Sequence, residues 1–265
     1  MPEGDSLRRY AERLRKLEGE IVAAETPHPR AQVLGLADRL DGRRLERVEA
    51  VGKNLLLTFE GGIVLRSHLK MNGRWHVRPA SHTVSGRPWL ILRGREWQAI
   101  QWNGPVLEIT RRPPEVVRRL GPDIMDAPPD LDEILRRLRT ASEREIGEAL
   151  LDQRLVAGIG NMWRAEALWV ARVSPWAPVA RLTDDELRRV VAAAAELMHG
   201  NRRRRVYRRP GVPCPRCSEL IRSKPQGEQL RTAYWCPVCQ RAGAVVAGRG
   251  AARRAAEAGT GVRGA

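Results

Sequence analysis

Four cysteines near the C-terminal end of the chain limit its fold more than any other feature. They form two Cys-x2-Cys pairs, Cys214/Cys217 and Cys236/Cys239, with eighteen residues between the pairs. Two such pairs at this separation can place four thiolates around one tetrahedral zinc ion, which leaves no coordination position for a substrate. Because the segment is too short and polar to hold a core without a cross-link, two metal-free pairs are the weaker interpretation. We therefore predict one structural zinc ion (Zn2+) on a β-hairpin that turns near 226–227.

The net charge of the chain indicates a polyanionic partner. Its 265 residues hold 47 Lys and Arg against 31 Asp and Glu, a formal net charge of +16. This excess favours nucleic acid, although an arginine-rich proteome would also produce it. No apolar run approaches the length of a membrane-spanning helix, and the first ten residues lack the apolar region of a secretory signal. We expect a cytoplasmic monomer with no membrane partner.

The first block, residues 1–112, is predicted to combine a helix with an antiparallel sheet. Apolar residues recur at helical spacing from Leu7 to Leu17, and short apolar runs follow with turn signals such as Gly61-Gly62 between them. The runs span 44–51, 54–59, 62–67, 74–78, 89–93, 99–102 and 106–110. Because no helix-length pattern separates them, we expect an antiparallel sandwich or flattened barrel.

The rest of the chain is predicted to be helical up to the cysteine segment. A proline-rich linker spans 113–130, a helical domain 131–206, a zinc finger 207–240 and a disordered basic tail 241–265, which has few large apolar residues. Helices are expected over 131–139, 144–152, 161–170 and, behind a capping box, 183–199. The predicted fold class is therefore α+β.

The residues after the initiator methionine could carry chemistry. If Met1 is removed, Pro2 presents a secondary amine, which can attack the anomeric carbon of a sugar and form an iminium ion. Glu3 places a carboxylate beside that amine. Many chains begin with Met-Pro-Glu and have no such activity, so these residues alone are weak evidence.

Three elements in one order give the chain a family resemblance. They are Pro2-Glu3-Gly4, a Gly-Ile-Gly-Asn turn between helices, and the four-cysteine finger. Together they resemble the formamidopyrimidine-DNA glycosylase / endonuclease VIII family of bifunctional DNA repair enzymes. The most specific segments are 150–161, which is similar to the family's helix–two-turn–helix, and 231–240, which is similar to its zinc-finger arm. The resemblance covers 2–240 and implies an N-terminal β-sandwich, a helical domain and a hairpin zinc finger.

The resemblance also implies an activity and four catalytic residues. Pro2 matches the nucleophile that forms a Schiff base with C1′ of the damaged nucleotide, and Glu3 matches the acid that protonates the sugar or the departing base. Lys53 matches the lysine on the sheet that donates a proton in β-elimination. Arg231 matches the finger arginine that binds the phosphates beside the lesion and is linked to δ-elimination. The partner would be damaged double-stranded DNA, and no cofactor besides zinc is implied.

Five further residues match DNA-contacting positions of the family. His68, Lys70 and Met71 fall in the loop that enters the duplex when the damaged base is flipped, where Met71 would fill the void. Asn161 matches the turn asparagine that bonds a DNA phosphate, at a helix start that already favours anions. Arg119 matches a linker arginine of the endonuclease VIII branch. Without the resemblance, Met71 could be a core residue, His68 a strand residue and Arg119 one partner of a linker salt bridge.

Departures from the family pattern favour the endonuclease VIII branch, which prefers oxidised pyrimidines and abasic sites. Ser6 stands where many members have Glu, and Asp5 could substitute. Segment 100–105 lacks the Arg and Phe of the second intercalating loop, although Trp102 could stack there or lie in the core. The connection 200–213 is shorter than the loop that encloses 8-oxoguanine. The alternatives are a homologue that binds lesions without cutting and a basic zinc protein that binds nucleic acid as an architectural module.

Overall fold

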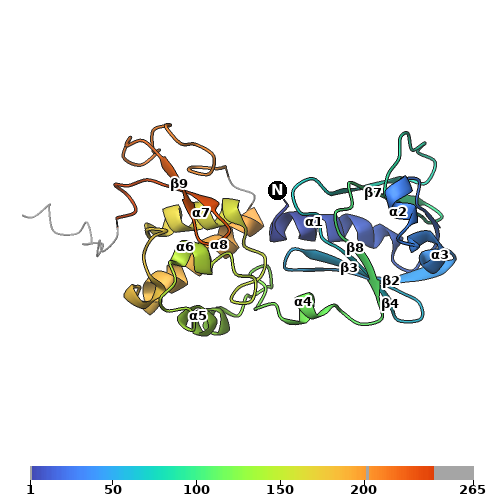
Figure 1. The fold of residues 1–265 in the computed structure, drawn as a ribbon, viewed down its shortest axis with the longest axis horizontal. Helices are drawn as coiled ribbons and strands as arrows, with labels where there is room; N and C mark the ends of the chain where they lie inside the picture. The colour runs from blue at the N-terminus through green and yellow to red at the C-terminus, as the bar shows by residue number, and fades with distance from the viewer. Residues whose placement is uncertain (1, 201–202, 242–265) are drawn as a thin grey trace, which may run out of the picture.

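The computed structural model describes residues 2–200 and 203–241 (Figure 1). Two lobes are joined by a linker that contains the short helix α4 (Glu115–Arg118). One lobe holds the N-terminal helix and the eight-stranded sheet, and the other holds helices and a two-stranded hairpin. The predicted α+β class is confirmed, whereas the predicted disordered tail, apart from Arg241, lies outside the described residues. None of the described helices is long and apolar enough to cross a membrane.

The sheet is antiparallel throughout, as predicted. Its strands are β1 (Ile21–Glu25), β2 (Arg43–Val51), β3 (Asn54–Phe59), β4 (Ile63–Ser67), β5 (Arg74–Pro79), β6 (Leu90–Arg93), β7 (Trp97–Trp102) and β8 (Leu107–Thr110). Their order is β5-β7-β6-β1-β2-β3-β4-β8. Strand β1, which was not predicted, pairs with β2 through its first two residues and with β6 through its last three. It therefore joins the two halves of the sheet.

Helix α1 (Gly4–Leu14) covers the core of this lobe. Its buried residues Leu7, Ala11 and Leu14 share one apolar cluster with residues from both halves of the sheet, among them Leu57 and Leu92. The helix continues as a 3-10 turn over Arg15–Leu17. Two short helices that were not predicted, α2 (Pro29–Gln32) and α3 (Leu36–Leu40), follow β1. The apolar stripe of α1 packs on the sheet. The N-terminal end of the helix, with Glu3 before it, lies beside the other lobe (Figure 1).

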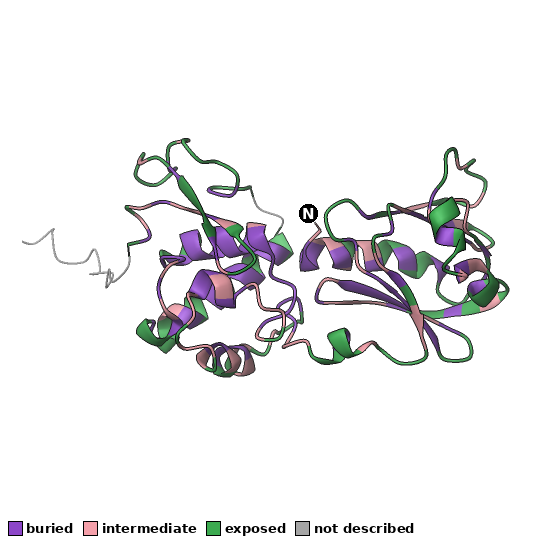
Figure 2. Ribbon diagram, viewed as in Figure 1, coloured by how far each residue is buried: buried purple, intermediate pink, exposed green. Residues whose placement is uncertain are grey.

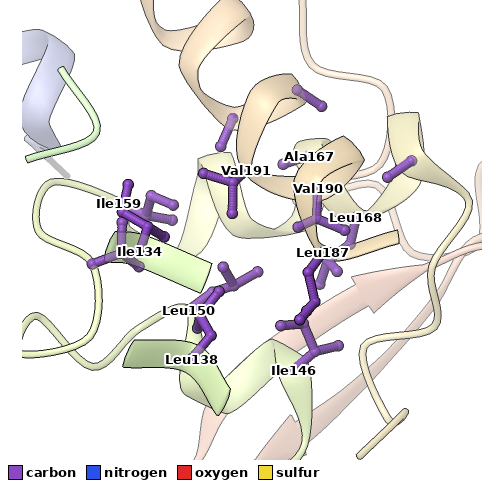
Figure 3. Packing of buried hydrophobic residues seen from close by; sticks show 14 of the residues in the cluster. Ile134, Leu138, Ile146, Leu150, Ile159, Ala167, Leu168, Leu187, Val190 and Val191 are labelled. Atoms are coloured by element: carbon purple, nitrogen blue, oxygen red, sulfur yellow. The ribbon is translucent and has the colours of Figure 1, made fainter. Parts of the chain in front are cut away.

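The second lobe is built around one apolar cluster, part of which is drawn in Figure 3. Its helices are α5 (Leu131–Arg139), α6 (Ile146–Ala149), α7 (Asn161–Ala171) and α8 (Asp184–Gly200), with a 3-10 turn at Val179–Arg181. The predicted capping box is present, since Thr183 and Glu186 exchange hydrogen bonds at the start of α8. Helix α7 is buried on almost all sides (Figure 2). Its N-terminus faces the first lobe.

The finger hairpin packs on α7. Strands β9 (Arg222–Gln226) and β10 (Arg231–Trp235) pair antiparallel, with a turn over 227–230 as the sequence predicts to within a residue. Trp169, from α7, and Tyr207, from the connection before the finger, share a cluster with Cys214 and Cys236. The finger is therefore attached to the helix whose N-terminus faces the first lobe.

Candidate active site and DNA-binding cavity

The carboxylate of Glu3 caps a helix of the opposite lobe. Its side chain is 1% exposed. Oε1 accepts the backbone N–H of Met162 at 2.8 Å, and Oε2 accepts those of Gly160 and Trp163 at 3.0 and 3.2 Å. Burial raises the pKa of Glu3, while the charge of Lys53 and the backbone hydrogen bonds oppose the rise. The result is a fixed carboxyl group that holds a proton more readily than an exposed glutamate.

Two close approaches explain the glycines around Glu3. A Cβ on Gly160 would lie 2.6 Å from Cγ of Glu3, so a side chain at 160 would displace the carboxylate. Gly4 donates its N–H to the carbonyl of Gly158 at 3.0 Å, and a Cβ on Gly4 would lie 3.0 Å from Cα of Gly158. The glycines of the 158–161 turn therefore let the N-terminus lie directly against α7.

Lys53 lies at the tip of the β2–β3 hairpin, in its two-residue turn rather than within a strand. Gly52 before it has φ +58, a left-handed conformation that suits glycine. Burial lowers the pKa of Lys53 to about 8; the nearby charge of Glu3 acts to raise it and that of Arg231 to lower it. The structure therefore brings Lys53 within electrostatic reach of both Glu3 and Arg231, although the three come from different segments.

Asp123 positions the turn that carries Lys53, and sequence reasoning missed it. Its Oδ2 accepts the N–H of Gly52 at 2.7 Å and its Oδ1 that of Met125 at 3.0 Å. Burial raises the pKa of the Asp123 carboxyl. An aspartate inside a proline-rich linker carries no sequence signal of this contact, because its partner lies 71 residues earlier.

The loop between β4 and β5 presents Met71 to solvent. Met71 is 52% exposed, so it is not a core residue. His68 is half-buried; its Nδ1 accepts the N–H of Lys70 at 3.1 Å, and burial together with the charges of Arg66, Lys53 and Lys70 lowers its pKa. Lys70 is exposed with φ +44. The loop thus holds an exposed apolar side chain beside a lysine and an uncharged imidazole.

A cavity of about 500 Å³ brings three of the predicted DNA-contacting side chains together. Met71 comes from the first lobe, Asn161 from the start of α7 and Arg231 from the finger. The other lining residues are Tyr207, Arg208, Gln229, Leu230, Thr232 and Tyr234. Arg119 is not among them. It lies on the linker, is 70% exposed and pairs with Glu115, which is the salt bridge considered as its alternative role.

Asn161 connects α7 to the finger. Its Nδ2 donates to the carbonyl of Thr232 at 3.0 Å, whereas its buried Oδ1 has no hydrogen-bond partner in the described part of the chain. An amide nitrogen carries two N–H groups, so one donor remains for a ligand. The side chain therefore fixes the residue that follows Arg231 and keeps a donor beside the cavity.

Arg164 is a second connection to the finger that sequence reasoning missed. Its guanidinium is buried and donates to the carbonyls of Gly147 and Thr232 and to Oε1 of Gln226, at 3.0, 3.0 and 3.1 Å. Burial lowers the pKa of Arg164 to about 10. The sequence held a signal, since a charged residue in the most apolar helix of the chain must have buried partners.

Asp5 and Trp102, which the sequence offered as substitutes for family residues, both make contacts within the protein. Asp5 is 3% exposed and accepts the indole N–H of Trp163 at 3.0 Å and a guanidinium N–H of Arg9 at 2.8 Å. Trp102 ends β7, and a Cβ on Gly86 would lie 3.3 Å from its ring, so the loop before β6 covers it. Asp5 thus joins α1 to α7, and Trp102 lies outside the main core cluster.

The four cysteines converge on a single point. Their sulfur atoms all lie within 4.8 Å of one another, and Cys217 and Cys236 are 3.4 Å apart. A tetrahedral zinc site with about 2.3 Å Zn–S bonds requires sulfurs about 3.8 Å apart. The donor set and its clustering could hold one metal ion.

Two family profiles match most of the chain. The formamidopyrimidine-DNA glycosylase N-terminal domain matches residues 1–102, and the formamidopyrimidine-DNA glycosylase H2TH domain matches residues 120–203. The chain is 36% identical to a probable endonuclease 8 2 of Streptomyces coelicolor, across 91% of this chain and 94% of that protein. It is 34% identical to a DNA-(apurinic or apyrimidinic site) lyase Nei2 of Mycolicibacterium smegmatis, across 91% and 100%.

A relative named as a glycosylase and a solved structure of another member also match the chain. A formamidopyrimidine-DNA glycosylase of Thermus thermophilus is 34% identical across 77% of this chain and 85% of that protein. The Lactococcus lactis formamidopyrimidine-DNA glycosylase, solved bound to DNA that contains an abasic site, superposes with a TM-score of 0.77 at 23% identity, across 91% and 100% of the two chains. At that identity the likeness establishes the fold.

Proposed function

Because this chain belongs to the formamidopyrimidine-DNA glycosylase / endonuclease VIII family of DNA glycosylases and abasic-site lyases, we propose that it removes oxidised bases from duplex DNA and then cuts the strand. Oxidised pyrimidines are the preferred lesions. The reaction passes through a Schiff base on Pro2 and ends in β,δ-elimination.

The observation that supports this mechanism best is that Lys53 lies within electrostatic reach of both Glu3, the residue after Pro2, and Arg231 of the finger. Glu3 is fixed by three backbone N–H groups of α7 and directly follows Pro2 in the chain. Lys53, from the first lobe, interacts electrostatically with Glu3 and with Arg231 of the finger. An amine, an acid and two cations at one place are what displacement of a base from a sugar beside phosphates requires.

The proposed first step is base displacement. With Met1 removed, the Pro2 nitrogen attacks C1′ of the flipped nucleotide while the glycosidic bond breaks and its electron pair leaves with the base. Glu3, whose pKa burial raises above that of an exposed glutamate, supplies a proton to the sugar or the leaving base. Attack first gives an aminal in which C1′ is bonded to the Pro2 nitrogen, which gives up its proton, and to the ring oxygen O4′. Protonation of O4′ then breaks the C1′–O4′ bond and opens the sugar, and the nitrogen lone pair forms the iminium bond to C1′.

Strand cleavage follows from the acidity that the iminium gives to C2′. Loss of a C2′ proton expels the 3′ phosphate, and a second elimination expels the 5′ phosphate, which leaves a one-nucleotide gap. Lys53, with a pKa of about 8, is mostly protonated at pH 7 and can donate in the first elimination. Arg231 binds the phosphates that leave.

The cavity beside this point would receive the DNA. Met71 fills the space of the flipped nucleotide, and Asn161 and Arg231, which also line the cavity, hold phosphates. Lys70, His68 and Arg119 lie outside its lining and contribute DNA contacts from the loop and the linker. Zinc is the metal we assign to the four cysteines, because four thiolates in tetrahedral spacing suit it. It would hold the finger, and so Arg231, in place.

Trapping with borohydride tests the mechanism. Incubation with abasic DNA and borohydride should reduce the iminium and leave a covalent protein–DNA adduct. Pro2→Gly should weaken the adduct severely, and an N-terminal tag that prevents Met1 removal should abolish it. An adduct of equal yield from the tagged protein would place the nucleophile elsewhere, with Lys53 the first candidate.

A further inference from the structure

The cavity contains an arginine that the proposed function has not used. Arg208 belongs to the connection between α8 and the finger, and it lines the same cavity as Met71, Asn161 and Arg231. None of the described lining residues is acidic. Within the part of the chain that the structure describes, neither Arg208 nor Arg231 forms an ion pair with a carboxylate. Both guanidinium groups are therefore free to bind an anion.

The backbone at Arg208 suits glycine better than arginine. Its φ is +57, in the left-handed region, where a side chain that begins with Cβ is disfavoured. Strained conformations of this kind persist where the surrounding structure enforces them, and they cluster at functional sites. The strain by itself identifies no ligand, but it shows that this position is tightly constrained.

The residues before Arg208 are anchored. The buried carboxylate of Glu166, on α7, accepts the N–H groups of Arg205, Val206 and Tyr207 at 2.8, 3.0 and 2.8 Å. The ring of Tyr207 packs edge-on against Tyr234 of the finger, with 5.3 Å between ring centroids. The segment is therefore fixed to both α7 and the finger, so the position of Arg208 is set before any ligand binds.

The charge, the cavity and the anchored backbone together indicate a phosphate. Most protein–DNA hydrogen bonds go to the sugar–phosphate backbone, and arginine matches phosphate with paired N–H donors. Tyr207 adds support, because the guanidinium of Arg208 lies 5.6 Å from the centre of its ring. We propose that Arg208 is a further residue of this cavity that binds a phosphate of the DNA backbone. This inference rests on the proposed function, since it takes the cavity to be the DNA site.

Replacement by glycine separates binding from folding. R208G removes the guanidinium but relieves the left-handed backbone, so the thermal midpoint should stay the same or rise. Equilibrium binding of a duplex with a tetrahydrofuran abasic analogue should weaken, and the slope of log K against log salt should become shallower by about 0.9. The ratio of wild-type to R208G affinity should therefore be about 3.5-fold larger at 50 mM than at 200 mM salt. R209A is the matched control, since Arg209 carries the same charge one residue on, is exposed and does not line the cavity.

The outcomes are distinct. A shallower slope in R208G with an unchanged slope in R209A supports the phosphate contact. Equal slopes in R208G and the wild type, or equal reductions in both variants, would overturn it. A loss of affinity in R208G with an unchanged salt slope would also overturn it, in favour of an uncharged contact. If the wild type neither binds the analogue nor traps on abasic DNA, it is the proposed function that fails, and wild-type trapping is therefore measured first.

Discussion

At the scale of single residues, Gly160 decides whether Glu3 can act. A methyl group at 160 would lie within 2.6 Å of Cγ of Glu3 and force the carboxylate off the α7 N–H groups. We expect Gly160→Ala to slow base removal by about a hundredfold or more, the range for a lost general acid. Cleavage of a preformed abasic site should suffer less, because it needs no protonated base. Single-turnover rates on lesion and abasic duplexes measure both, and a variant with full base-removal rate would show that Glu3 is not the acid.

Lys53 gives the reaction a dependence on pH. Burial lowers its pKa to about 8, so the ammonium group is present below that pH and is lost above it. Cleavage of abasic DNA should therefore fall as the pH rises through about 8. In Lys53→Arg the guanidinium stays charged, so the variant can be slower but should lack this fall. Single-turnover cleavage from pH 6 to 10 at saturating enzyme tests it, and an identical alkaline fall in the variant would assign the titration to another group.

The sequence could identify some functional residues but not their supports. The cysteines are recognisable because zinc coordination dictates both residue type and spacing, whereas Pro2 and Glu3 are candidates only through the family resemblance. Asp123 is not recognisable, because its partner lies 71 residues away in the chain. Arg164 could be marked as a buried charge, but its partners, up to 68 residues away, could not be identified. Such contacts depend on how the lobes pack, and no local pattern records that. The same limit applies to Asp5, whose bond to Trp163 spans 158 residues.

At the scale of elements, helical periodicity predicts the observed bounds better than short apolar runs predict strands. Helix α5 begins and ends where the sequence indicates, because its apolar stripe and its Asp130 cap agree. Strand β1, with sequence Ile-Val-Ala-Ala-Glu, was missed because alanine and glutamate favour helix. Pairing with β2 and β6 overrides that preference, as tertiary context commonly does in sheets.

The finger should fold only with its metal. The hairpin adds few apolar side chains of its own, so metal binding supplies much of its folding energy. We expect one zinc ion per chain, and Cys236→Ser should lose the ion together with most abasic-DNA cleavage, because Arg231 is then no longer held. Elemental analysis and cleavage rates measured on the same preparation test this, with Ser218→Ala as the control. Full cleavage by metal-free protein would contradict a structural metal.

At the scale of the whole molecule, the site exists only because the lobes meet. Glu3 bonds α7, Gly4 bonds Gly158 and Gly52 bonds Asp123, each across the junction. An exposed ion pair between Arg8 and Asp126, at 3.1 Å, adds little by comparison. The carboxylate of Glu3 belongs to one lobe and the N–H groups that fix it belong to the other. The geometry of the reaction therefore depends on the relative position of the two lobes.

The same arrangement predicts which lesions are cut. Residues 203–213 are anchored to Glu166 and to the finger, so the described part of this connection has no free segment to enclose an oxidised purine. The turn after β7 holds Asn103, which contacts the Met71 loop through Asn72, in place of an Arg/Phe wedge.

We expect thymine glycol, dihydrouracil or 5-hydroxycytosine to be released at least about tenfold faster than 8-oxoguanine opposite cytosine, a difference of the size that a few pocket contacts give. Single-turnover rates on duplexes that differ only in the lesion decide it, with an abasic duplex of the same sequence as the control for lyase activity. Faster release of 8-oxoguanine than of every oxidised pyrimidine would overturn the preference and leave the Pro2 mechanism intact, because the nucleophile attacks the sugar whichever base departs.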